Sequence, residues 1–97
     1  MASKVKRWVA ADGSRAGLNY ACAHCGIHTI VTEGGGAWGW DGNEEAPTFT
    51  PSVLLTDPSR NRVCHSFVRG GMVEYLNDCT HADAGKTVPL PDLPDWL

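Results

Sequence analysis

The sequence lacks the features that would place it in a membrane or on nucleic acid. No stretch approaches the roughly 18 consecutive apolar residues that suggest a membrane-spanning helix. The 8 Lys and Arg residues are outnumbered by 11 Asp and Glu residues, for a net charge of -3. Because binding to phosphates needs a cationic surface, this charge balance disfavours a nucleic-acid-binding role. No apolar stretch follows the basic N-terminus as in a secretory signal, so we expect a cytoplasmic protein.

Several common catalytic motifs are also missing. The chain has neither the His-Glu-x-x-His segment of zinc proteases nor the His-x-Glu segment of zinc deaminases. It has no Gly-x-Ser-x-Gly nucleophile elbow, and its Gly34–Gly36 run lacks the Lys-Ser/Thr that completes a phosphate-binding loop. These patterns therefore assign no catalytic residue, and they favour a binding protein over an enzyme.

The 97 residues suit a single domain, residues 1–97. Two β-hairpins are predicted, one around the Cys22–Cys25 segment and one around the Gly70-Gly71 turn, with at most one short helical turn, in residues 78–85. The fold class is therefore all-β and zinc-ribbon-like. A Pro-rich tail covers about residues 86–97, and from Pro89 onward its prolines lack backbone donors. We expect this tail to lie extended over the domain, outside any sheet, with Leu90, Leu93 and Trp96 as anchors.

The strongest chemical signal is Cys22-Ala23-His24-Cys25-Gly26, in a chain with four cysteines and four histidines. Two thiolates at this spacing chelate one zinc ion in a tight turn. A redox dithiol and plain core cysteines are the alternatives, but the redox motif needs a βαβ context that is not predicted here. Zinc is therefore the expected cofactor, with Cys22 and Cys25 as two of its ligands.

The second hairpin offers the remaining ligands. A two-residue turn at Gly70-Gly71 places Cys64 and Cys79 on the same face if the second strand continues that far. His81 follows closely, and zinc accepts either four thiolates or three thiolates and an imidazole. The predicted third ligand is Cys64, and the fourth is either Cys79 or His81.

Four other residues are candidates for contact with a partner: Trp38, Trp40, Phe49 and His65. Aromatic side chains often anchor protein interfaces, although core packing is the alternative for the tryptophans. His65 points away from Cys64, because adjacent strand residues face opposite sides, so these two cannot form a catalytic pair. His28 is interpreted as a surface residue of a strand.

Residues 38–43, 47–52, 64–68 and 78–88 together resemble a functionally uncharacterised family of small proteins from tailed phages and prophages. Its members are sometimes mislabelled ammonia monooxygenase. The similarity runs over residues 20–96 and implies a phage origin, with a role in the host cytoplasm such as host takeover or countering host defence. Within this resemblance the match at Thr80-His81 favours His81 as the fourth ligand.

Together these observations predict a zinc-binding accessory protein that acts as a protein-binding module, with a structural metal site. A small zinc-dependent hydrolase is the first alternative, in which His65 or His81 acts as acid or base. A nucleic-acid-binding zinc knuckle that uses the tryptophans is the second alternative.

Overall fold

The computed structural model describes residues 3–97, which form nine β-strands and one short 3-10 helix. The predicted all-β class is confirmed. Among the described residues, no helix is long and apolar enough to cross a membrane. The elements are β1 (Val5–Val9), β2 (Ala16–Cys22), β3 (Gly26–Glu33), β4 (Gly39–Trp40), β5 (Phe49–Thr50), β6 (Val53–Asp57), η1 (Pro58–Arg60), β7 (Arg62–Arg69), β8 (Met72–Tyr75) and β9 (Thr87–Pro89).

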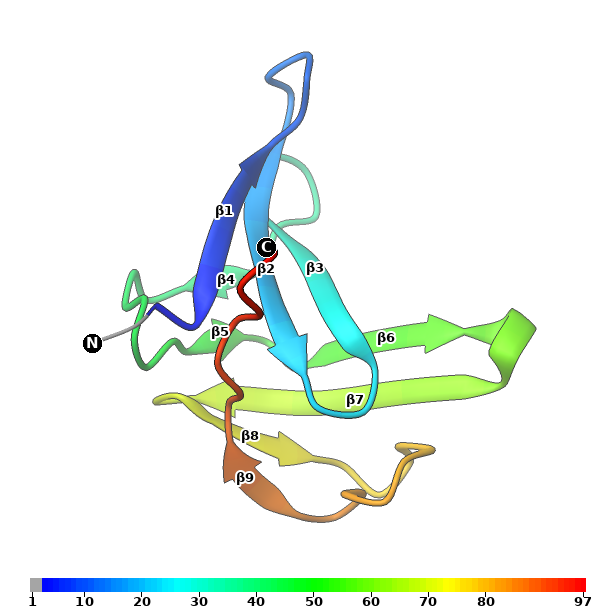
Figure 1. Ribbon diagram of the computed structural model, residues 1–97. Coiled ribbons are helices and arrows are strands. Elements are labelled where there is room, and N and C mark those ends of the chain that lie inside the picture. Colours follow the sequence, from blue (N-terminus) through cyan, green and yellow to red (C-terminus); the bar gives the residue numbers. More distant parts are fainter. Residues whose placement is uncertain (1–2) are drawn as a thin grey trace.

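The strands form three antiparallel sheets, in the orders β1-β2-β3, β4-β5 and β6-β7-β8-β9. Both predicted hairpins are present, as β2–β3 and β7–β8, and each is extended by further strands. In Figure 1 the β1–β3 sheet stands over the four-stranded sheet, and its β2–β3 turn reaches down to β7. This arrangement brings the Cys22–Cys25 turn to the strand that carries Cys64.

Strand β2 is buried along almost its whole length because it lies between β1 and β3. At Gly17 the backbone of β3 approaches so closely that an added Cβ would lie 1.9 Å from the carbonyl oxygen of Ile30. The strand register shifts between Ala16 and Gly17. Only glycine permits this contact, which helps to set the position of β3 against β2.

The β7–β8 hairpin turns at Gly70 and Gly71, whose φ angles are 57° and 78°. Positive φ at both central residues is the requirement of a type I′ turn, which glycine meets without strain. The resulting register pairs Arg69 with Met72, as expected from the sequence. The ladder then determines which side chains of β7 face inward and which face outward.

The core lies between the two larger sheets and includes Phe49, which is only 1% exposed. Phe49 is thus unavailable to a partner, contrary to its predicted role, because the short β4–β5 sheet turns its ring inward against Tyr20. Trp38 and Trp40 are partly buried and pack against the same core. The buried core residues are Val5, Leu18, Tyr20, Cys22, Ile30, Phe49, Val53, Cys64, Val68, Val73, Tyr75, Cys79 and Leu90.

The chain after β8 differs from prediction in two places. Residues 78–85 form turns and no helix, and the only short helical turn of the described residues lies at Pro58–Arg60. The tail joins the four-stranded sheet through β9, where Pro89 lies opposite Met72. This is allowed because Pro89 ends an edge strand. Leu90 is buried as expected, but Trp96 is 76% exposed and does not anchor the tail.

Candidate catalytic and metal-binding sites

Four potential metal ligands converge where the β2–β3 turn meets β7. Cys22 ends β2, Cys25 lies in the turn, His28 belongs to β3 and Cys64 to β7, and their ligand atoms all lie within 4.8 Å of one another. All four cysteines of the chain are free thiols. The structure therefore brings the predicted Cys22, Cys25 and Cys64 together and adds His28 to them.

His28 provides a direct test of whether this group suits a metal ion. Its side chain is buried, and its Nε2 has no hydrogen-bond partner among the residues described. An unpaired buried ring nitrogen is costly, and coordination to a metal would satisfy it. The alternating pattern of β3 contained the signal for this placement, because Ile30, two residues further along the same face, lies in the core.

The electrostatics of the thiols lead to the same conclusion. Hydrogen bonding to Cys22, and then burial, raises the pKa of Cys64, whereas burial, followed by the charge of Cys22, raises the pKa of Cys25. The same hydrogen bond with Cys64 lowers the pKa of Cys22, so one thiolate forms readily and then opposes the ionisation of the other two thiols. A divalent cation reverses this effect, so the donor set fits a metal ion.

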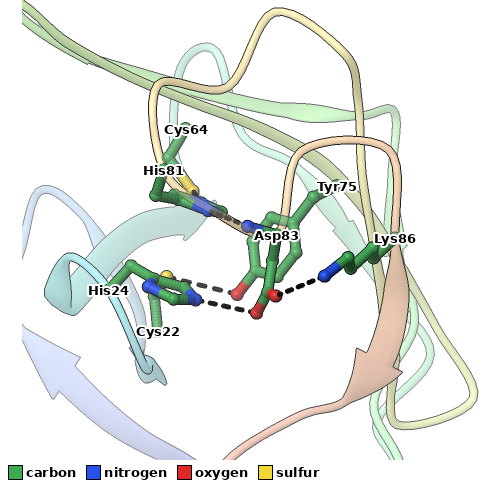
Figure 2. Close-up of polar contacts among 7 residues, drawn as sticks. All are labelled: Cys22, His24, Cys64, Tyr75, His81, Asp83 and Lys86. Carbon is green, nitrogen blue, oxygen red and sulfur yellow. Dashed lines mark hydrogen bonds and ion pairs between the residues drawn. The ribbon is translucent and has the colours of Figure 1, made fainter.

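Two side chains that do not belong to this group, Tyr75 and His81, lie close to its sulfur atoms, as Figure 2 shows. The Tyr75 hydroxyl lies 3.2 Å from Cys22 Sγ, and hydrogen bonding to Cys64 first, and to Tyr75 among others, lowers the pKa of Cys22. A Cys22 thiolate can only accept, and the Tyr75 hydroxyl is then its donor. His81 Nε2 lies 3.7 Å from Cys64 Sγ. The backbone N–H of Asp83 donates to His81 Nδ1 at 3.3 Å, which leaves the ring proton on Nε2, directed at the sulfur.

The surroundings of His81 separate it from the main group of ligands. Its ring stacks on that of His24 with centroids 4.4 Å apart, and His24 Nε2 pairs with Asp83 Oδ2 at 2.7 Å. His81 and Cys79 form a second group with Cys64 that could also hold an ion. Neither of the two residues predicted as the fourth ligand lies in the group that contains the Cys22–Cys25 turn, where His28 takes that place.

On the outward face of the four-stranded sheet, a serine, a histidine and an aspartate are hydrogen-bonded in series. Ser52 Oγ lies 3.1 Å from His65 Nε2, and His65 Nδ1 lies 2.9 Å from Asp78 Oδ2. A nucleophile, a general base and a carboxylate that orients the base require this connectivity. We call these three residues the triad.

The sheet register explains how the triad forms. Strands β6 and β7 place Leu54 opposite His65, and Ser52 precedes Leu54 by two residues and so shares its face. Beyond the end of β8, Leu76 N–H still donates to the His65 carbonyl at 2.8 Å. The turn that follows this last ladder bond holds Asp78 beside the imidazole of His65.

The triad is open to solvent. The side chain of His65 is 24% exposed and that of Asp78 is 55% exposed. Three hollows of the described chain lie elsewhere, the one between β3 and β6 having a volume of about 350 Å³, and none of them is lined by Ser52 or Asp78. The triad therefore lies on the sheet surface, outside these three hollows.

Sequence motifs had assigned no role to Ser52 or Asp78. They had treated His65 as a partner contact or, in the zinc-hydrolase alternative, as an acid or base. The available signal was weak, because only the alternation of β7 indicated that His65 points outward. Trp38, another predicted partner contact, donates its indole N–H to the Ser52 carbonyl at 3.2 Å and so supports the triad.

A serine, histidine and aspartate linked in this order are the arrangement that serine hydrolases use. A family model described as bacterial ubiquitination-like system serine protease (BubE) matches residues 2–76, and the chain belongs to this family. Ser52 and His65 lie inside the matched segment, and Asp78 lies just beyond it. Comparison with curated proteins and with solved structures found no match. The phage origin suggested by the sequence resemblance stays a prediction.

Proposed function

We propose that the chain acts as a serine protease of a bacterial ubiquitination-like system, with Ser52 as nucleophile, His65 as general base and Asp78 as the group that orients the base. The observation that carries this proposal is the pair of hydrogen bonds in series, 3.1 Å and 2.9 Å long, that connect the three side chains. The family description supports the same chemistry.

The mechanism follows from these contacts. Ser52 Oγ attacks the carbonyl carbon of the scissile amide while its proton passes to His65 Nε2, and Asp78 accepts the Nδ1–H bond and stabilises the imidazolium. Breakage of the C–N bond transfers that proton to the leaving amine and leaves an acyl group on Ser52. Water then attacks the ester with His65 again as base, which releases the acid and restores the Ser52 hydroxyl.

The protein partner predicted from sequence is, in this proposal, the substrate. Leu54, directly opposite His65, is 51% exposed, and Met72 on the same sheet face is 40% exposed. Both offer apolar contacts to a polypeptide that covers the triad. Binding to nucleic acid gains no support, because the net charge is -3.

We also propose that zinc is bound by the thiolates of Cys22, Cys25 and Cys64 and by the imidazole of His28. Three sulfurs and one nitrogen are a common donor set of structural zinc sites. Four protein ligands leave no open position for a water molecule, which favours a structural role over a zinc-dependent hydrolase. When bound, the ion would join the β2–β3 turn to β7, the strand that carries His65.

A fluorophosphonate probe tests the nucleophile without knowledge of the substrate, because it reacts covalently with activated serines. We expect mass spectrometry to locate the adduct on Ser52 in the natural chain and to find none in Ser52→Ala. Ser59→Ala, which removes an exposed serine away from the triad, serves as the matched control and should be labelled normally. Cleavage of a proteome-derived peptide library should give new N-termini with the natural chain and with Ser59→Ala, and none with Ser52→Ala. Absence of an adduct on Ser52 would refute the proposal.

Elemental analysis tests the metal. We expect one zinc ion per chain, loss of zinc in Cys25→Ser and in His28→Ala, and a lower melting temperature after chelation. A chain that purifies without a stoichiometric metal, and whose melting curve a chelator leaves unchanged, would contradict the assignment.

A further inference from the structure

Cys79 is a buried thiol, 8% exposed, that contacts the main chain of His65 on both sides. The His65 N–H donates to Cys79 Sγ at 3.2 Å, and the thiol donates to the His65 carbonyl at 3.2 Å. We propose that Cys79 is a positioning residue for His65, which it holds in register for proton transfer with Ser52. This inference rests on the proposed function.

The need for such a residue comes from the way the β7–β8 ladder ends. Strand β8 stops at Tyr75, and Leu76 N–H makes the last backbone bond to His65 before Cys79 N–H closes a turn on the Leu76 carbonyl at 3.1 Å. Beyond that point the chain leaves the sheet. The thiol of Cys79 replaces the backbone partner that a continued strand would have offered to His65.

The same turn places Asp78 against the imidazole. Asp78 and Cys79 are neighbours in the chain, so one short segment holds His65 at two points, the ring through Asp78 Oδ2 and the backbone through Cys79 Sγ. When the backbone and Nδ1 of His65 are both held, the ring can rotate little, and the position of Nε2 relative to Ser52 is fixed. Misplacement of a catalytic group by about 1 Å costs on the order of 100-fold in rate, so this double attachment bears directly on acyl transfer.

The position of Cys79 separates this role from the proposed zinc site, because Cys79 lies outside the group formed by Cys22, Cys25, His28 and Cys64. A thiol both donates and accepts, and Cys79 does both with His65, whereas a metal-bound thiolate only accepts. Removal of Cys79 should therefore leave the zinc content unchanged, unlike removal of Cys25.

The next residue in the chain provides a matched control. Thr80 Oγ1 accepts from the Val63 N–H at 3.0 Å and donates to the Val63 carbonyl at 3.3 Å, which is the same pair of contacts two residues earlier in β7. Thr80→Val removes these two side-chain contacts of the same turn and leaves His65 untouched, while the backbone N–H of Thr80 still donates to the Val63 carbonyl at 3.0 Å. Any loss of rate from general loosening of the turn will appear in this variant as well.

The experiment measures inactivation of the purified full chain by a fluorophosphonate, resolved into the maximal rate kinact and the half-saturating concentration KI, together with zinc content. For Cys79→Val we expect kinact to fall about tenfold or more with KI within about twofold. Cys79→Ser keeps a donor and an acceptor and should retain at least about a third of the natural kinact. Thr80→Val should stay within about threefold of the natural chain, and all three should keep one zinc ion.

The other possible outcomes refute the positioning role of Cys79, the proposed function, or both. A natural kinact in Cys79→Val, or an equal loss in Thr80→Val, refutes the positioning role while leaving Ser52 as the nucleophile. Loss of zinc in Cys79→Val identifies a metal ligand instead. Absence of labelling on Ser52 in the natural chain refutes the proposed function and this inference together. If Cys79→Val does not fold, Cys79→Ala removes the same thiol with less steric change.

Discussion

Replacement of Asp78 by Asn should slow the acylation of Ser52 without preventing the protein from folding. The change removes the negative charge that lies 2.9 Å from His65 Nδ1 while it keeps the size of the side chain. Two consequences follow: the imidazolium formed during attack loses its stabilising partner, and the amide can hold the ring in the wrong tautomer.

The magnitude depends on how far water reaches this pair. Two unit charges at about 4 Å interact by about 1 kcal/mol in bulk water and by about 4 kcal/mol at the effective dielectric near a protein surface. Asp78 is 55% exposed and His65 is 24% exposed, which places the pair between these limits. Since about 1.4 kcal/mol corresponds to a tenfold change in rate, we expect a loss of roughly 10- to 100-fold. The loss of about 10,000-fold known for a buried triad should not occur here.

The assay is the rate of fluorophosphonate labelling of Ser52, measured with circular dichroism melting as a check on folding. Asp57→Asn is the matched control, because Asp57 is 44% exposed and pairs with Arg60 at the far end of β6. The control should label at the natural rate. A loss of less than threefold in Asp78→Asn, with the fold intact, would show that Asp78 does not orient the base.

Two further predictions concern the metal group and the β2–β3 packing. Tyr75→Phe removes the hydroxyl that donates to Cys22 Sγ, so we expect zinc affinity, measured by competition with a chelator, to fall about 10- to 100-fold; unchanged affinity would contradict the hydrogen bond. Gly17→Ala forces a Cβ against the Ile30 carbonyl and should lower the free energy of unfolding in urea by about 2 kcal/mol or more. Gly35→Ala, where a Cβ meets nothing within 4 Å, is the control and should change it little.

Local patterns predicted much of the fold. The β7–β8 hairpin and its register could be predicted because Gly70-Gly71 specifies a primed turn between adjacent strands. The β2–β3 hairpin could be predicted for a similar reason, since its apolar strands flank the cysteine turn directly. The β9 strand could not, because Pro89 indicated a break, and only the position of β8 showed that its edge was available for pairing.

The group of metal ligands and the triad also differ in how far the sequence alone predicts them. The sequence by itself determined that Cys22 and Cys25 lie close together, because two thiols three positions apart in one turn approach each other whatever the rest of the chain does. Only the tertiary structure decided that His28 completes this group, and that Ser52, His65 and Asp78 meet. The triad contacts join residues 13 positions apart on different strands and turns, and their distances depend on sheet register and on the exact point where β8 ends. Neither the sheet register nor the residue at which β8 ends can be read from a short motif. The three residues of the triad are therefore brought together by the packing of the sheet.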